Sequence, residues 1–188
     1  IKDKRINKDY SNEKEFIELG ARILRFEFGP NKYLRKELLW PYLDELVNKL
    51  SKFYINPKNK PNWIHAHYAD AGYVGVRLSK ILKIPLVFTA HSLGREKKRR
   101  LIDAGLKLNQ IEKSYCISKR ISAEEEALKE SSMIVTSTKQ ESVHQYATYQ
   151  FFDSLKAKVI SPGVDYDKFH HIHSTTETSD IDTMMSPF

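Results

Sequence analysis

The chain has 188 residues and a formal net charge of +7 at pH 7. Hydrophobic residues make up 40% of it, which is enough for a folded core and argues against wholesale disorder. The polar opening segment lacks the apolar run of a signal peptide, and no stretch reaches the roughly 20 apolar residues of a membrane span. We therefore expect a soluble protein, and the first residue, Ile1, indicates part of a longer chain.

The single cysteine, Cys116, cannot form an internal disulfide, and with the seven histidines it gives no metal-ligand spacing. We therefore expect a reducing compartment, the cytoplasm, and neither metal nor other cofactor. The basic charge fits nucleic acid, an acidic membrane or a small anion as partner, and equally a solvated lysine-rich surface.

The first predicted element is a strand at residues 21–28, closed by Gly29 and Pro30. Apolar residues then recur at steps of three and four over residues 38–53, which predicts an amphipathic helix. Pro41 is expected to interrupt this helix near its first turn. The proline-containing segment that follows it predicts a loop.

Residues 63–67 predict a strand and residues 70–82 a helix. The continuous apolar run at residues 85–90 is typical of a strand buried on both faces in a parallel sheet. Two charged helices are expected next, at residues 96–104 and 108–129.

A further strand is predicted at residues 133–136, a helix at 139–149 and a last strand at 158–160. The alternation of strands and helices predicts an α/β fold, with a Rossmann-like parallel sheet and helices on both of its faces. We assign this domain to residues 1–169. Residues 170–188 change composition and are expected to form a flexible linker or the start of another domain.

Ligands of open α/β sheets bind at the carboxyl ends of the strands. Polar segments follow four of the predicted strands, and together they suggest a site at that edge of the sheet. They begin at His65, Thr89, Thr136 and Ser161.

The segment after the strand at 85–90 carries His91 and Ser92 and runs into a basic stretch that includes Lys97. A serine hydroxyl, a helix N-terminus with free N–H groups and a lysine would together form a phosphate pocket. Alternatively, Ser92 only caps the helix and the lysines are solvated. His91 is either a structural histidine or a hydrogen-bond donor at the sheet edge. The acidic run from Glu124 to Glu126 predicts a solvated helix face.

Six segments resemble, in the same order, successive motifs of the sucrose-phosphate synthases. They are GPNKYLRKELLWPYL, HAHYADAGYVG, FTAHSLGREK, ISKRISAEEEAL, IVTSTKQE and ISPGVDYDKF. The similarity spans Gly29 to Phe169. The HSLG and TSTKQE segments are shared with sucrose synthases and other retaining glycosyltransferases.

The resemblance implies the amino-terminal half of a GT-B glycosyltransferase, in which two Rossmann-like domains face each other across a cleft. In that family the amino-terminal domain holds fructose 6-phosphate and the carboxy-terminal domain holds UDP-glucose. Glucose is transferred with retention of configuration, which gives sucrose 6-phosphate, and no metal or cofactor takes part. This chain would supply the acceptor side and be inactive alone, because nothing in it resembles the donor domain.

The resemblance also implies roles for six residues. Those of the acceptor site are Lys36, Tyr68, Ser92, Lys97 and Arg120. Lys97 and Arg120 would neutralise the phosphate, while Ser92 and Tyr68 would donate hydrogen bonds. His91 would be catalytic, lying near the transferred sugar and stabilising charge in an oxocarbenium-like transition state.

The chain departs from the family pattern in two further ways. Lys119 stands where the family usually has a second arginine, and a lysine lacks the bidentate geometry of a guanidinium. The glycine-rich amino-terminal loop of the family has no counterpart, so the chain is expected to begin after it.

Rival functions remain at this point. A sucrose synthase would take free fructose, and a mannosyl-transferring relative would differ only in its donor site. A rival of another class is a non-catalytic basic module that binds sugar phosphates or nucleic acid. The aromatic residues fall on predicted core stripes and are not interleaved with lysines. We therefore expect neither nucleic acid nor membrane as partner.

Overall fold

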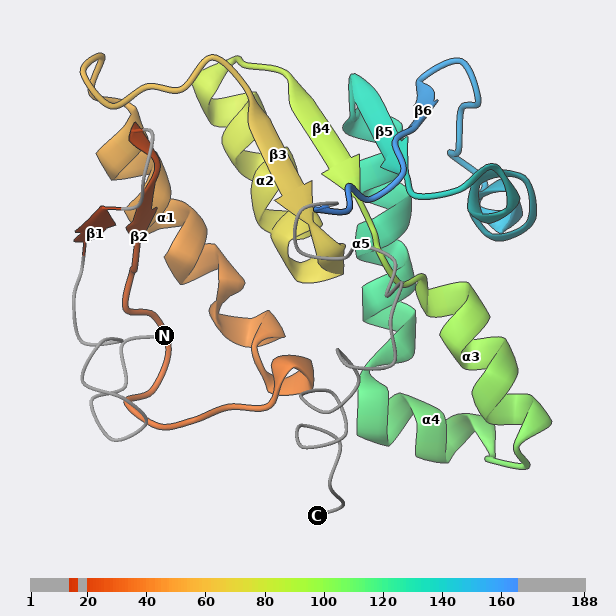
Figure 1. Ribbon diagram of the computed structural model, residues 1–188. Helices are drawn as coiled ribbons and strands as arrows, with labels where there is room; N and C mark the ends of the chain where they lie inside the picture. The colour runs from red at the N-terminus through yellow and green to blue at the C-terminus, as the bar shows by residue number, and fades with distance from the viewer. Residues whose placement is uncertain (1–13, 17–19, 166–188) are drawn as a thin grey trace, which may run out of the picture.

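The computed structural model describes residues 14–16 and 20–165, so the predicted linker at 170–188 lies outside the described residues. Four short strands form a parallel sheet in the order β3, β4, β5, β6 (Figure 1). Their bounds are Ile64–His67 for β3, Leu86–Thr89 for β4, Met133–Thr136 for β5 and Ala157–Val159 for β6. These strands match four of the five predicted ones and confirm the parallel α/β sheet. The domain division at residue 169 stays a prediction.

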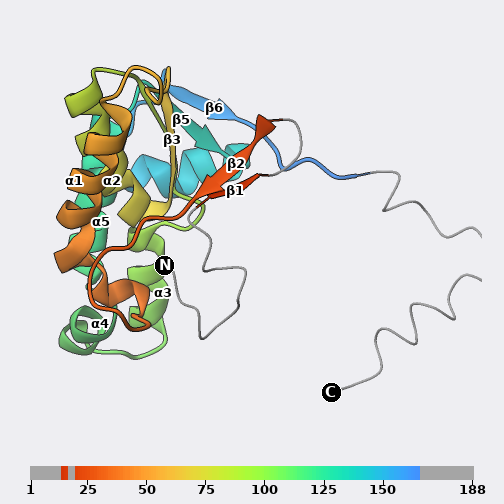
Figure 2. The same cartoon turned by 90° about the vertical axis from the view of Figure 1, so that its left-hand side faces the viewer.

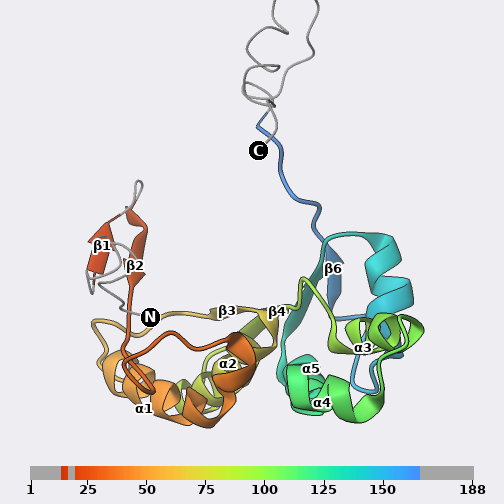
Figure 3. The same ribbon diagram turned by 90° about the horizontal axis from the view of Figure 1, so that it is seen from below.

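The described helices that pack along this sheet lie on one side of it. Helix α2 (Tyr68–Leu82) joins β3 to β4, and α5 (Ile117–Glu130) leads into β5. They lie on the same side as α1 (Leu43–Tyr54) (Figure 2, Figure 3). The reason is that right-handed crossovers stepping in one direction across a sheet place their helices on one face. The predicted helices on both faces are therefore not found in the described residues.

Side chains alternate along the strands between the helix-covered face and the open face. On the covered face Phe88 and Ile134 are fully buried. On the open face His65 and His67 of β3 are exposed, and Trp63 just before them is 55% exposed. The sequence IHAH thus places its two histidines outward and Ala66 inward.

Two apolar clusters form the core. One lies between the sheet and its helices and contains Leu86, Phe88, Leu128, Ile134 and Tyr146. The other joins α1 to α2 and α5, and its members are Trp40, Leu43, Val47, Ala69, Val74, Leu78 and Ala123. No described helix has the length and apolarity that crossing a bilayer requires.

The strand predicted at residues 21–28 does not join the parallel sheet. Only β2 (Arg22–Leu24) forms there, and it pairs antiparallel with β1 (Lys14–Phe16) in a separate two-stranded sheet. The physical reason is that strands of a parallel sheet are apolar on both faces, whereas this run carries charges at Arg22, Arg25 and Glu27.

The helix predicted at 38–53 begins with two 3₁₀ turns, η3 (Lys36–Leu38) and η4 (Trp40–Tyr42), before α1 starts. Pro41 lies in the first positions of η4, which confirms the predicted interruption. These turns bring Lys36 and Trp40 to the carboxyl edge of the sheet.

The predicted helix at 108–129 is two helices, α4 (Leu108–Tyr115) and α5, which follow α3 (Gly94–Asp103). Cys116 separates them with a φ of 46°, in the left-handed region. Neither glycine nor proline marks this break in the sequence. The segment predicted as a helix at 139–149 consists of a π turn, η5 (Glu141–Gln145), and a 3₁₀ turn, η6 (Tyr146–Thr148).

Gly72 of α2 packs closely against β4 and α5, and it provides a test of this packing. A Cβ there would lie 2.8 Å from Phe88 Cε2 and 3.1 Å from Ala127 Cβ. The overlap costs about 1–3 kcal/mol and outweighs the roughly 1 kcal/mol that alanine gains in helix propensity. We expect Gly72→Ala to lower the free energy of unfolding in a urea titration.

The matched control is Gly163→Ala, because nothing lies within 4 Å of a Cβ built at Gly163. It should change the free energy of unfolding by less than about 0.5 kcal/mol. A stabilising Gly72→Ala would contradict the close packing of α2 on β4.

Candidate functional site

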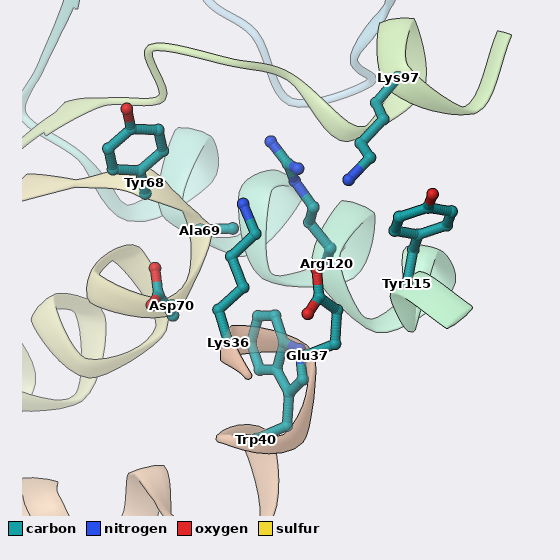
Figure 4. A pocket seen from close by; sticks show the side chains of 9 residues that line it. All are labelled: Lys36, Glu37, Trp40, Tyr68, Ala69, Asp70, Lys97, Tyr115 and Arg120. Carbon is teal, nitrogen blue, oxygen red and sulfur yellow. The ribbon is translucent and has the colours of Figure 1, made fainter. Parts of the chain in front are cut away.

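A pocket of about 210 Å³ lies at the carboxyl ends of β3 and β4 (Figure 4). Its lining comes from η3, η4, the first turn of α2, α3, the end of α4, and α5. The lining residues are Lys36, Glu37, Trp40, Tyr68, Ala69, Asp70, Lys97, Tyr115 and Arg120. The pocket is smaller than the about 300–1,000 Å³ of clefts that take drug-sized ligands, which suits a small polar ligand.

Three cationic side chains from three different elements converge on this pocket. The charged ends of Lys36, Lys97 and Arg120 point into the same space (Figure 4). Two carboxylates, Glu37 and Asp70, also line it. Glu37 is offset by Arg35, whose Nε lies 3.5 Å from its carboxylate. The balance of charge is therefore positive, which favours an anionic ligand.

The pKa of Lys97 is affected by this crowding of positive charge. Burial, followed by the positive charges of Lys36 and Arg120, lowers the pKa of Lys97 from its ordinary value. Its ammonium lies 4.0 Å from the centre of the Tyr115 ring, a cation–π contact that holds it over the pocket. A bound anion would reverse the unfavourable interaction among the cations.

Arg120 is held from behind by a buried carboxylate. Its Nε donates to Glu124 Oε1 at 2.9 Å, and its Nη2 donates to the Ser92 carbonyl and, at 3.3 Å, to the Ser92 hydroxyl. Glu124 is 0% exposed and also accepts a hydrogen bond from the Tyr149 hydroxyl. Ser92 thus joins the edge of the site through Arg120.

The prediction of a solvated acidic face at 124–126 is wrong. Glu124 is fully buried. Glu125 accepts a hydrogen bond from Arg95 at 2.7 Å, and Glu126 accepts one from Arg77 at 3.0 Å. A run of three glutamates gives no sign of these partners, which come from α2 and α3.

Two of the N–H groups expected to be free at the start of α3 are occupied within the protein. The Gly94 N–H donates to both oxygens of Glu124, at 3.1 and 2.9 Å, and the Arg95 N–H donates to the Tyr149 hydroxyl at 3.0 Å. The N-cap position is Leu93, without a side-chain cap, so Ser92 does not cap the helix. The positive charge at this site therefore comes mainly from the side chains of Lys36, Lys97 and Arg120.

Tyr68 is the first residue after β3 and His91 the second after β4, and both have left-handed backbones. Their φ values are 71° and 55°, and their rings lie 4.9 Å apart between centres. A left-handed conformation costs a non-glycine residue roughly 1–3 kcal/mol, and such strain gathers at functional sites. It turns both side chains out at the edge of the sheet.

A row of histidines continues along the open face beside His91. His67 Nδ1 lies 2.6 Å from His91 Nε2, and His65 Nε2 lies 2.8 Å from the Thr89 hydroxyl. Burial first, and then the charge of His91, lowers the pKa of His67, which is therefore neutral at pH 7. Within residues 14–16 and 20–165, no three His, Cys, Asp or Glu side chains are arranged to hold a metal ion.

The structure brings the six predicted site residues to one edge of the sheet. Those that line the pocket are Lys36, Tyr68, Lys97 and Arg120. Ser92 contacts Arg120, and the His91 ring lies beside the Tyr68 ring, tilted by 37°. The strand ends after β5 and β6 do not contribute to the pocket lining.

Several residues that line the pocket were not predicted from the sequence. Trp40 stands in the KELLWPYL segment, four positions after Lys36. Its place in the same motif as Lys36 is the signal in the sequence that could have identified it. Tyr115 had no signal, because the break at Cys116 that places it was not foreseen. Lys119 is not among the lining residues, and its ammonium lies 5.9 Å from the centre of the Trp40 ring.

A family model described as the first GT-B domain of sucrose synthase matches residues 13–175. The chain belongs to this family. It is 42% identical over 156 residues to a probable sucrose-phosphate synthase of Thermosipho melanesiensis, covering 80% of this chain and 36% of the relative. It is 36% identical over 213 residues to the sucrose-phosphate synthase of Spinacia oleracea, covering 94% of this chain and 20% of the relative. The chain therefore spans about a fifth to a third of these relatives.

The fold of this GT-B domain is also seen in a solved structure. The sucrose-phosphate synthase of Thermosynechococcus elongatus matches with a TM-score of 0.69 at 18% identity. The match covers 91% of this chain and 39% of that chain. This confirms the predicted fold class, a GT-B α/β domain.

Sulfate, whose charge does not change near neutral or alkaline pH, tests the electrostatics of the pocket. Lys97 carries its charge at low pH and loses it as the pH rises through its lowered pKa. We expect sulfate affinity, measured by calorimetry, to fall at a pH below the ordinary lysine pKa of about 10.4. Lys97→Arg should move this fall to higher pH, because arginine stays protonated. An affinity that is flat up to that pH would contradict the role of Lys97.

Proposed function

We propose that this chain is the acceptor side of a retaining glycosyltransferase that moves glucose from UDP-glucose to fructose 6-phosphate, giving sucrose 6-phosphate. The observation that carries the proposal is the convergence of Lys36, Lys97 and Arg120 on one small pocket. The relatives named sucrose-phosphate synthase support it. UDP-glucose would be bound mainly by a second domain, so this chain alone would not catalyse transfer.

In this proposal the sugar phosphate lies with its phosphate among the three cations. Lys97 and Arg120 neutralise the charge, and Tyr68 and Ser92 donate hydrogen bonds. Trp40 and Tyr115 contribute apolar surface to the pocket wall. The two lining carboxylates, Glu37 and Asp70, can accept hydrogen bonds from sugar hydroxyls.

The cationic pocket favours a phosphorylated acceptor over free fructose. A site for an uncharged sugar would gain nothing from three gathered cations and would bear their mutual repulsion. The three cations converge on one small pocket, whereas a nucleic-acid backbone is bound along an extended basic groove. The proposal places the enzyme in the cytoplasm, with small sugar substrates as its partners.

Lys97→Ala and Arg120→Ala test the acceptor site. Each removes a charge-assisted hydrogen bond, so each should weaken fructose 6-phosphate binding roughly ten- to a hundredfold. Free fructose, which lacks the phosphate, should be little affected. Calorimetric titration of the complete enzyme with both sugars measures this selectivity.

Lys98→Ala is the matched control for Lys97→Ala. Lys98 is the next residue on α3 and lines a different cavity. It should leave fructose 6-phosphate affinity unchanged. Equal binding of fructose and fructose 6-phosphate by the unaltered enzyme would contradict the proposal that the pocket binds the acceptor phosphate.

His91→Ala tests the catalytic assignment. His91 projects from the strained end of β4, beside the acceptor pocket. Loss of a donor to developing charge should lower kcat by about 10²–10³. The KM for fructose 6-phosphate should stay close to its original value, because His91 does not line the pocket. A change confined to KM would contradict a role in the transition state.

A further inference from the structure

Glu124 is a buried carboxylate at the back of the site, and none of the roles above uses it. It lies on α5 and is 0% exposed. Its oxygens accept hydrogen bonds from Arg120 Nε at 2.9 Å, from the Gly94 N–H at 2.9 Å and from the Tyr149 hydroxyl. Three separate parts of the chain therefore meet at one side chain.

Folding alone gives no reason for a charge at this position. Burial raises the pKa of Glu124, and the hydrogen bonds from Tyr149 and Arg120 act against that rise. Apolar residues of similar volume often replace buried ion pairs without loss of stability. The carboxylate therefore has to be explained by what it does to its partners.

The packing around Glu124 leaves little freedom. A Cβ at Gly94 would lie 2.8 Å from Glu124 Oε2 and 2.9 Å from Ile121 Cγ1. The start of α3 thus rests directly on the carboxylate. The two residues before Leu93, His91 and Ser92, connect this fixed point to the end of β4.

Glu124 also sets the direction of the Arg120 guanidinium. Nε is bound to Glu124, and Nη2 is directed to Ser92. Among the described residues, Nη1 makes no hydrogen bond, and Arg120 lines the pocket. The guanidinium is therefore held on one side and free to donate on the other.

We propose that Glu124 is a positioning residue for the acceptor phosphate: it fixes the Arg120 guanidinium toward the pocket and anchors the loop that carries His91 and Ser92. This inference rests on the proposed function. A long cationic side chain that is already ordered loses less entropy on binding an anion. Glu124 therefore raises affinity without touching the ligand.

Glu124→Gln in the complete enzyme tests this role, since it keeps the shape and removes the charge. We expect the KM for fructose 6-phosphate to rise roughly tenfold, as for other residues that orient a ligand-binding group, with a smaller change in kcat. In the Arg120→Ala background the same substitution should raise KM by a much smaller factor, because the guanidinium that Glu124 orients is gone and only the anchoring of the Ser92 loop remains. A merely structural residue would act equally in both backgrounds.

Two variants on the same helix are controls. Leu128→Ala removes a fully buried side chain of α5 that does not line the pocket, and Glu126→Gln removes a charge that pairs with Arg77. Neither should change the KM for fructose 6-phosphate. If Glu124→Gln fails to fold, Tyr149→Phe removes only the hydroxyl that donates to Glu124, and KM should rise in the same direction.

The outcomes separate the two proposals. If Arg120→Ala raises KM and Glu124→Gln does not, the positioning role is overturned and the acceptor site stands. The positioning role is also overturned, and the acceptor site still stands, if Glu124→Gln raises KM by an equal factor in both backgrounds. If Arg120→Ala itself leaves KM unchanged, the acceptor site fails and the positioning role fails with it.

Discussion

The candidate site depends on one buried interaction, the contact of the Glu124 carboxylate with Arg120, Gly94 and Tyr149. A carboxylate taken out of water is costly unless donors surround it. Here the donors come from α5 itself, from the start of α3 and from the segment after β5. The hydrogen bonds to the carboxylate therefore fix these elements relative to one another. Because α3 and α5 carry Lys97 and Arg120, this also fixes that part of the pocket wall.

A second feature of the site is that two energetically unfavourable arrangements, repulsion between like charges and backbone strain, lie at one edge of the sheet. Lys36, Lys97 and Arg120 crowd positive charge into a small volume. At the same edge, Tyr68 and His91 hold left-handed backbones. Neither arrangement helps folding. Their coincidence at the carboxyl ends of β3 and β4 fits a site that binds an anion and presents polar rings above it.

Local pattern in the sequence was enough for most of the elements. Four strands of the parallel sheet and the interruption at Pro41 follow from apolar periodicity and from proline chemistry, both of which act within a few residues. The resemblance in motif order supplied all six candidate site residues, and the structure brings them to one edge. The antiparallel pairing of β2, the packing of the described helices on one side of the sheet and the break at Cys116 were not foreseen. Each depends on which neighbours an element finds, and periodicity does not record that.

The sequence by itself therefore determined an α/β domain with its polar segments at the strand ends and its cations in the motifs. Only the tertiary structure decided which of these groups meet. Glu124 is the clearest case. A glutamate in an acidic run has the composition of a solvated face, yet its carboxylate is buried against Gly94, 30 positions away. The physical reason is that burial and hydrogen bonding of a charge are set by groups distant in the chain, which converge only when helices pack.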